Sequence, residues 1–543
     1  MTAQRAGNGD ARMTPTQRWT MFAAILGTAI VFLDGTIVNQ ALQRIGQDLP
    51  ATLVETLEGQ TYVSSGYLAT LAALLVLAGA LADYYGRRRI FAIGLVGFGL
   101  TSALCGAAPT LELLAVFRVL QGAAGALLVP GSIAIITALF AGPARARAFG
   151  IWAAATSATV LLAPFVGGTI VDSVGWRFAF LINIPLIVPA LWATLRHMPE
   201  TRDESATGRF DWLGAVVVVL AVGGLSFGAI RGSDRQWQDP LAFGAIGIGL
   251  VALVAFPILM ARRPDPLVPP SLFRIRRFAV INVSTLLIYA ALYANMGFQA
   301  IFLQGILGYT ATASGAVGLP AGIMLTAFSA RIGALAGRIG ARRFLTAGPL
   351  LMAGGLLWLA RIPSDSAPWL ALVSSPATFV PPTSTLIDVL PAMLLFGVGL
   401  SLVVAPLTAT LMSSVPTRNA GLASAINNAI SRVGQPIVAA VIFIVVSGTF
   451  YTTLASRVPG VDASSPELRG AVQPLNPPAE GTPPQLALAA REASTDAFHF
   501  AALIAAGLLV AGAAANYVGL RNEHAAAGSG STAATPAGDP GAG

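Results

Sequence analysis

The chain has 543 residues, of which 55% are hydrophobic and only 10% are charged. Soluble proteins carry about 25% charged residues, so this composition excludes a water-soluble fold and predicts a polytopic membrane protein. The formal net charge is +8, and all 32 basic residues are Arg. We attribute this excess to the charge asymmetry that orients helices in a bilayer, rather than to nucleic-acid binding.

The first 18 residues are polar and contain three Arg, and an apolar run follows them. A secretory signal peptide also begins with basic residues, but this run has no convincing small-residue cleavage site, so we interpret it as a permanent first helix. Fourteen runs are long and apolar enough to span a bilayer. The predicted spans are 19–42, 62–82, 90–107, 113–139, 148–170, 178–196, 211–230, 241–261, 278–304, 314–335, 344–361, 388–413, 420–448 and 496–519.

The distribution of Arg predicts the orientation. An even number of spans places both termini on one side, and the chain segments on that side contain 21 Arg against 8 on the other. This asymmetry predicts cytoplasmic termini. The outer loops 362–387 and 449–495 are long and rich in Pro, Ser and Thr, and could form short hairpins, interfacial helices or partly ordered loops. The tail 521–543 has the composition of a disordered segment.

An internal repeat links the two halves of the chain. Residues 79–89 read GALADYYGRRR and residues 333–343 read GALAGRIGARR, so the opening four residues, the second glycine and the closing Arg pair keep their offsets. Related halves of this kind are typical of secondary transporters. In the first copy, Gly79 and Gly86 permit tight turning, and Asp83 could cap the thirteenth span near residues 420–424 in one conformation. A solvated turn is the alternative.

Asp34 is the main candidate for chemistry. It lies 15 residues into the first span, about 22 Å along the helix. An ionisable group at that depth is costly and usually marks an ion pathway, because burial disfavours the charged form. We therefore predict that Asp34 carries protons, with a purely structural ion pair as the alternative. Arg118 is its predicted partner, and the aligned position of the second half holds Met393, so this charge is not part of the repeat.

Uncharged polar residues in the spans either line a cavity or bond neighbouring helices together. The candidates for a substrate cavity are Asn39, Gln121, Tyr289, Tyr293, Gln299, Asn427 and Asn428. In the fifth span, Pro164 removes a helix hydrogen bond, and Gly167 and Gly168 thin one helix face. This pattern predicts a kink or a surface on which helices slide.

No phosphate-binding loop, nucleophile–His–acid set or metal cluster is evident in the sequence, so we expect neither an enzyme nor a cofactor. Cys105 is the single cysteine and allows no intramolecular disulfide. A multi-pass enzyme would need clustered catalytic groups at one membrane face, and a passive channel would need no proton coupling.

Together these motifs resemble the major facilitator superfamily, and in particular its fourteen-helix drug:proton antiporter family. The similarity covers residues 19–520 and rests on the 79–89 loop, on Arg118 with Gln121 and Gly122, and on four further segments. Those segments are 33–39, 176–185, 302–309 and 421–428. The fifth-span motif departs from the family pattern, because Ala163 precedes Pro164 where that family usually has glycine.

The resemblance implies an all-α fold of two six-helix bundles, 19–196 and 278–520, with two extra spans inserted in the linker 197–277. It also implies that Asp34 and Arg118 belong to the proton and substrate pathway, and that Gly79, Asp83, Gly86 and Arg87 form a conformational gate. The nearly complete absence of membrane acids in the second half, where Asp388 lies at the end of a span, argues against strong export of dications.

We therefore expect a monomeric exporter in the inner (cytoplasmic) membrane, which exchanges protons for amphipathic small molecules by rocking two bundles around a central cavity. Its partners would be the small amphipathic substrate, protons and the lipid bilayer, with no nucleic acid. Deprotonated Asp34 would bind cargo or pair with Arg118. A dedicated exporter of a native lipid or secondary metabolite, with the same fold, is the alternative.

Overall fold

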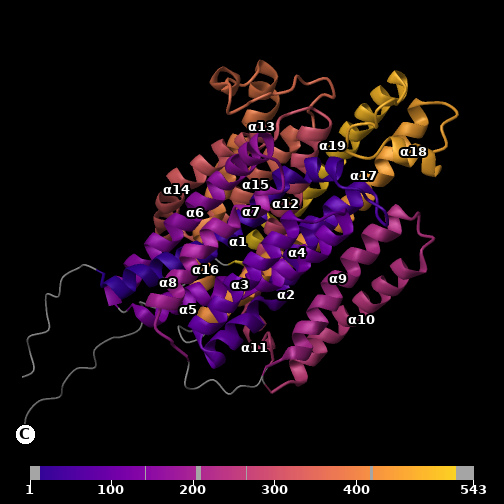
Figure 1. Cartoon of the computed structure of the whole chain (residues 1–543). Coiled ribbons are helices and arrows are strands. Elements are labelled where there is room, and N and C mark those ends of the chain that lie inside the picture. Colours follow the sequence, from indigo (N-terminus) through magenta and orange to yellow (C-terminus); the bar gives the residue numbers. More distant parts are fainter. Residues whose placement is uncertain (1–12, 141, 203–209, 265, 416–419, 521–543) are drawn as a thin grey trace, which may run out of the picture.

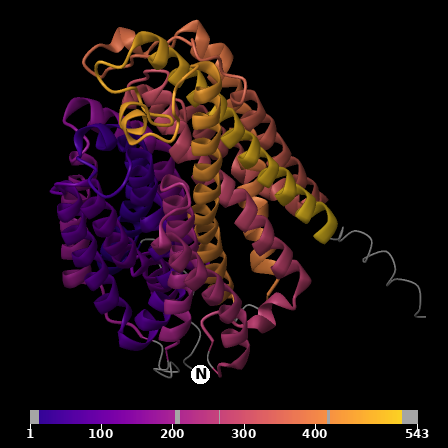
Figure 2. The same ribbon diagram turned by 90° about the vertical axis from the view of Figure 1, so that its right-hand side faces the viewer.

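The structure, a computed structural model, describes residues 13–140, 142–202, 210–264, 266–415 and 420–520. Long helices dominate these ranges, and the only pairing of extended residues in them is an isolated bridge between Leu372 and Ser375. The N-terminal half, in indigo and purple, lies beside the C-terminal half, in orange and yellow (Figure 2). The predicted N-terminal segment up to residue 12 and the tail 521–543 lie outside the described residues.

The first half consists of eight helices. They are α1 (Pro15–Asp48), α2 (Thr56–Tyr85), α3 (Arg87–Gly106), α4 (Leu111–Ala126), α5 (Val129–Leu139), α6 (Gly142–Ser173), α7 (Phe178–Leu181) and α8 (Asn183–His197). The helices α4 and α5 together make one span, as do α7 and α8.

The linker and the second half follow. The linker helices are α9 (Trp212–Asp234), α10 (Pro240–Arg262) and α11 (Pro270–Phe273). The second half has α12 (Arg276–Gly305), α13 (Ala311–Ala316), α14 (Leu319–Ile339), α15 (Ala341–Leu359), α16 (Leu390–Ser413), α17 (Ala420–Arg457), α18 (Pro466–Ala471) and α19 (Pro484–Gly519). Two short turns complete it, a 3₁₀ turn η1 (Pro376–Phe379) and a π-helical turn η2 (Thr385–Val389) that runs into α16.

Twelve helices in the described ranges are long and apolar enough to cross a membrane. The fourteen predicted spans include α6 and α15 as well, so that count stays a prediction. The structure differs most from the sequence prediction at the second outer loop. There α17 continues to Arg457 and α19 begins at Pro484, so the helices take up both ends of the predicted loop 449–495.

Local sequence explains where helices begin and turn. Thr14 and Gln17 form a reciprocal capping box at the start of α1, with Pro15 at the first helical position. In the repeated loops, Gly86 and Gly340 separate α2 from α3 and α14 from α15, with φ of 107° and 94°. Residues with a side chain rarely adopt such positive φ angles, so the repeat keeps a glycine at each of these turns.

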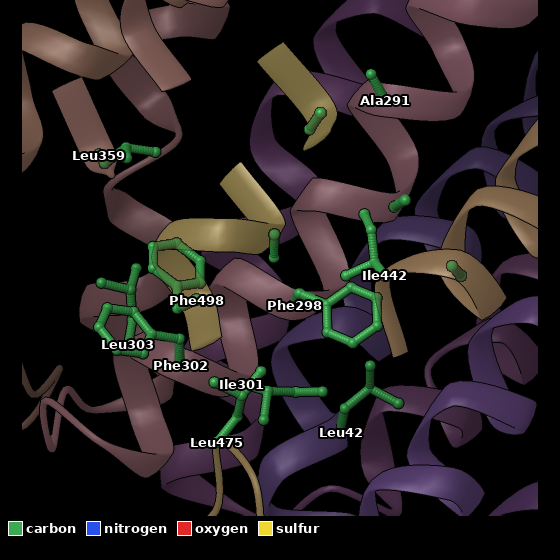
Figure 3. Packing of buried hydrophobic residues seen from close by; sticks show 14 of the residues in the cluster. Leu42, Ala291, Phe298, Ile301, Phe302, Leu303, Leu359, Ile442, Leu475 and Phe498 are labelled. Carbon is green, nitrogen blue, oxygen red and sulfur yellow. The ribbon is translucent and has the colours of Figure 1, made fainter. Parts of the chain in front are cut away.

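The apolar core joins the helices within each half and across the seam. In the second half, the rings of Phe302 on α12 and Phe498 on α19 stack with centroids 4.0 Å apart (Figure 3). Buried residues of both halves, including Leu42 of α1 and Phe298 of α12, belong to one continuous cluster. The two halves therefore share an apolar interface.

The segments 360–384 and 458–483 lie at the same end of the molecule, at the top of Figures 1 and 2, which we term the loop end. The hairpin of α9 and α10 lies on one flank of the bundle (Figure 1). There α9 packs against α2 of the first half and α17 of the second, and Tyr62 stacks on Phe227 with centroids 5.5 Å apart. The hairpin thus covers one seam between the halves.

Candidate functional site

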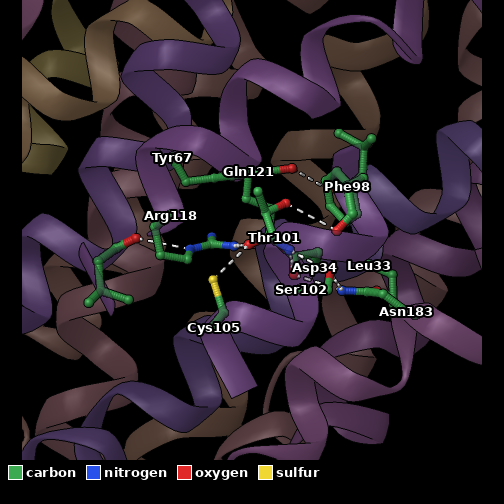
Figure 4. Close-up of polar contacts among 12 residues, drawn as sticks. Leu33, Asp34, Tyr67, Phe98, Thr101, Ser102, Cys105, Arg118, Gln121 and Asn183 are labelled. Carbon is green, nitrogen blue, oxygen red and sulfur yellow. Dashed lines mark hydrogen bonds and ion pairs between the residues drawn. The ribbon is translucent and has the colours of Figure 1, made fainter. Parts of the chain in front are cut away.

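Asp34 of α1 and Arg118 of α4 form a buried ion pair, in which guanidinium Nη1 donates to carboxylate Oδ2 (Figure 4). The two side chains are 0% and 1% exposed. The other carboxylate oxygen accepts hydrogen bonds from Asn183 Nδ2 at 2.9 Å and from Gln121 Nε2 at 3.1 Å. Ser102 Oγ lies 3.2 Å and 2.8 Å from the same two amide nitrogens and accepts from both. One cation and two amides therefore compensate this carboxylate inside the first half.

The guanidinium of Arg118 is held from its other side by α2. Its Nε donates to the carbonyl of Val63 at 3.2 Å, and its carbon lies 4.0 Å from the ring centroid of Tyr67. Tyr67 is fixed in turn by a 3.0 Å hydrogen bond from its hydroxyl to the carbonyl of Val31. A methyl group at Gly122 would overlap the carbonyl of Tyr67, so glycine at this position allows α4 to approach α2.

A central cavity of about 400 Å³ lies between the two halves, and Asp34 is not among the described residues that line it. Phe32 and Thr36 of α1 do line it. Residues two positions away lie on nearly opposite sides of a helix, so α1 separates the carboxylate from the cavity. The ion pair and the cavity are therefore neighbouring but distinct sites.

Most of the predicted cavity residues do border this space. These are Tyr289, Tyr293, Gln299, Asn427 and Asn428. Asn427 also donates to Asn282 Oδ1 at 3.1 Å and to Thr285 Oγ1 at 2.9 Å, so it both faces the cavity and bonds α17 to α12.

Two predicted cavity residues are placed elsewhere. Gln121 is fully buried beside Asp34, because its amide is occupied by the ion-pair network. Asn39 is turned toward Ser64 of α2, with 3.5 Å between the two side-chain oxygens, and is not among the described lining residues. Both side chains therefore make polar contacts inside the first half, and neither is among the described residues that line the cavity.

The predicted gate residues lie at the end of the molecule opposite the loop end. Asp83 Oδ1 accepts from Arg87 Nε at 2.9 Å and Nη2 at 2.8 Å, and Arg87 also reaches the carbonyl of Ala134 on α5 at 3.4 Å. With Gly79, these residues border a second cavity of about 1010 Å³, whose far wall includes Ser424 of α17. Residues 416–419, before the first turn of α17, lie outside the described residues.

At the loop end, the halves close together through α6 and α13. A methyl group at Gly168 would overlap the carbonyl of Ala311, and one at Gly315 would overlap the carbonyl of Pro164. A methyl group at Gly167 would lie 3.0 Å from the Cα atom of Ile37 on α1, a tight contact within the first half. The glycines of the fifth-span motif therefore let the backbones of opposing helices touch.

Asp172 fastens the same contact. Its carboxylate oxygens accept hydrogen bonds from the backbone N–H groups of Ala311 at 3.1 Å and Thr312 at 2.6 Å, which begin α13. The sequence analysis did not identify Asp172. Its position, four residues after Gly168 and just past the predicted span 148–170, could have marked it as a candidate. The sequence analysis also missed Ser102, because no pattern in the sequence indicates that this residue lies near Asp34.

Solved structures of membrane transporters share the fold of this chain. A bacterial homologue of the human lysosomal transporter Spinster superposes with a TM-score of 0.60 at 17% identity, covering 94% of this chain and 98% of that one. A D-xylose–proton symporter gives a TM-score of 0.57 at 14% identity, with 93% and 98% covered. At these identities the likeness concerns the fold.

The sequence model of the Major Facilitator Superfamily matches residues 24–439, and the chain belongs to that superfamily. Multidrug resistance protein Stp of Mycobacterium tuberculosis is 33% identical over 81% of this chain and 78% of its own length. Puromycin resistance protein pur8 of Streptomyces alboniger is 32% identical, over 82% and 84%. Tetracenomycin C resistance and export protein of Streptomyces glaucescens is 30% identical, over 78% and 74%. The protein is a transporter and not an enzyme.

Proposed function

We propose that this protein is a proton-coupled exporter of amphipathic small molecules in the cytoplasmic membrane. The observation that carries the proposal is the buried pair of Asp34 and Arg118, one helix away from a central cavity that both halves of the transporter line. Its relatives Stp and pur8 are named for drug resistance, which supports export as the direction.

The proposal includes the topology. We count α6 and α15 with the twelve helices that meet the criteria for a span, which gives fourteen, and we assign residues 19–196 and 278–520 to the two bundles. The linker 197–277 would contribute the extra pair α9 and α10. The Arg asymmetry favours a cytoplasmic location for both termini, so the loop end would face outward.

With that orientation, the described conformation corresponds to the inward-facing state. The halves touch at the loop end through Gly168 and Asp172. Both cavities are bordered by Ser424 and Asn428, which makes a route from the centre toward the cytoplasmic end. Rocking the bundles would open the loop end and bring Asp83 toward the start of α17, where a carboxylate is favoured by the helix dipole.

The proton would bind a carboxylate oxygen of Asp34. Protonation removes the negative charge that pairs with Arg118, so the free energy of this buried pair differs between the two proton states. A conformation that admits outside water to Asp34 would load the proton, and the inward-facing state would release it. Downhill proton movement would thereby drive cargo outward.

A matched pair of variants in proteoliposomes tests this proposal. Asp34→Asn keeps the shape and hydrogen-bonding capacity of the side chain but cannot carry the proton, so an imposed pH gradient should no longer drive transport of a fluorescent amphiphile. Asp365→Asn, an exposed acid of the loop end, is the control and should transport as wild type. Undiminished gradient-driven transport by Asp34→Asn would refute the proton role.

A second candidate is a dedicated exporter of a native lipid or secondary metabolite. It is favoured by the similarity to a relative named for export of tetracenomycin C. A drug-susceptibility panel and a profile of excreted lipids and metabolites in a deletion strain separate the two. A changed profile without drug hypersensitivity would favour the dedicated exporter.

A further inference from the structure

Among the described residues that line the central cavity, one side chain is charged. Arg432 of α17 is only 4% exposed and lies against the cavity, with its guanidinium carbon 5.0 Å from the ring centroid of Phe32 on α1. Its Nε is buried and has no hydrogen-bond partner among the residues that the structure describes. The Phe32 ring attracts the cation but supplies no negative charge.

The described wall of the cavity offers Arg432 no carboxylate. Among the described residues that line it, none is Asp or Glu, and the other polar groups are neutral amides and hydroxyls. Asp34 already pairs with Arg118 and is separated from the cavity by α1. Asp388 lies in η2, just before the start of α16, and accepts a hydrogen bond from Ser366 at 2.9 Å. The described wall of the cavity therefore carries a net positive charge.

An uncompensated cation inside a membrane protein is costly, and the cost falls when an anion binds beside it. A cationic ligand would meet the opposite situation, because it adds a like charge in a region of low dielectric constant. The remaining wall suits an apolar body, since Phe32, Phe396 and the pair Tyr289–Tyr293, with ring centroids 5.9 Å apart, border the same space.

We propose that the cavity selects amphipathic anions, in which a carboxylate, sulfonate or phenolate is attached to an aromatic or apolar body, and that Arg432 is the charged contact. The anionic group would bind the guanidinium, while the ring system lies among the aromatic side chains. This inference rests on the proposed export function and names the substrate class of the same cavity.

Two dyes that share a xanthene core but differ in charge test the proposal. Fluorescein is anionic at neutral pH and rhodamine 6G is cationic, and fluorescence polarisation reports their binding to the purified full-length protein in detergent. We expect wild type to bind fluorescein more tightly than rhodamine 6G. Arg432→Gln should weaken fluorescein binding about tenfold or more, the effect of losing one hydrogen bond to a charged group.

Two further variants separate charge from folding. Arg432→Lys keeps the positive charge and should retain most of the fluorescein affinity. Arg361→Gln removes an exposed arginine that stacks on Trp358, 3.6 Å from its ring centroid and outside the cavity, and should bind both dyes as wild type. If wild type prefers rhodamine 6G, or if Arg432→Gln binds fluorescein unchanged, the assignment of an anion site is wrong.

The same dyes distinguish a failure of this inference from a failure of the proposed function. Fluorescein that binds but is not moved by a pH gradient would leave the anion site intact and refute proton-coupled export. Gradient-driven movement of rhodamine 6G without binding of fluorescein would support the exporter and refute the anion site.

Discussion

The carboxylate of Asp172, at the end of α6, caps the first turn of α13 by accepting the backbone N–H of Thr312 at 2.6 Å. The two residues belong to opposite halves of the transporter, so this bond exists only when the loop end is closed. A side-chain cap contributes about 1 kcal/mol to a helix end. In the proposed transport cycle, Asp172 would therefore stabilise the conformation with a closed loop end.

Removal of this cap should shift the conformational equilibrium. We expect Asp172→Ala to raise the ratio of loop-end-open to loop-end-closed molecules roughly fivefold, the equivalent of about 1 kcal/mol. Spin labels at the exposed positions Val174 and Leu370, one on each half, report the distance across the loop end. Asp365→Ala is the control, and an unchanged distance distribution in Asp172→Ala would show that the cap does not hold the halves together.

The glycine contact beneath the cap leads to a steric prediction. Gly168→Val should prevent full closure of the loop end, because its side chain would overlap the backbone carbonyl of Ala311. Transport should fall strongly while the protein still reaches the membrane. Gly354→Ala on α15 is the matched control, since a methyl group there meets no described atom within 4 Å. Wild-type transport by Gly168→Val would mean that this close approach is not required.

The buried ion pair predicts non-additive stability. Either Asp34→Asn or Arg118→Gln alone leaves the charge of the other residue unpaired. Each should lower the free energy of unfolding by about 3–5 kcal/mol. The double variant removes both charges and should recover part of that loss, although neither single nor double variant should couple transport to protons. Thermal unfolding of the purified proteins in detergent measures the cycle. Strictly additive effects would contradict a direct interaction.

Asp83 should affect the rate of the cycle rather than the affinity for cargo. Asp83 borders the second cavity, is not among the described residues that line the central cavity with Arg432, and is engaged by Arg87 at 2.8 Å. We expect Asp83→Asn to slow gradient-driven transport while dye binding changes less than about twofold. An equal loss of binding would argue against a gating role.

An anionic cargo also changes the electrical balance of transport. Exchange of one inward proton for one outward monoanion moves two positive charges inward, and each is worth about 2.3 kcal/mol per 100 mV. A potential that is negative on the cytoplasmic side should therefore accelerate fluorescein export in vesicles of defined orientation. A rate of fluorescein export that does not change with the membrane potential would contradict this exchange.

The sequence predicted the scaffold and the pairing of Asp34 with Arg118 because both are intrinsic to short stretches of chain. Hydropathy marks most spans, and glycines at Gly86 and Gly340 are needed by the turns that they make. A membrane interior offers a buried acid few partners, so a single unrepeated Arg in a neighbouring span was a strong candidate.

The remaining contacts depend on how distant helices rotate against one another. The side chain of Gln121 could have faced either the cavity or the interior of its own bundle, and packing of α4 on α2 turns it toward Asp34. Asp172 and Thr312 are 140 residues apart, and no periodicity in either helix encodes their meeting. The orientation of Arg432 likewise follows from the tertiary arrangement of α17.

The position of α9 across both α2 and α17 has a consequence for lipophilic cargo. On that flank the hairpin covers the seam where the halves meet. In the proposed orientation it would shield this seam from a molecule dissolved in the inner leaflet. We therefore expect a lipid-dissolved substrate to enter the central cavity from the other flank, beside α6 and α14, so that the bilayer would supply the transporter from one side only.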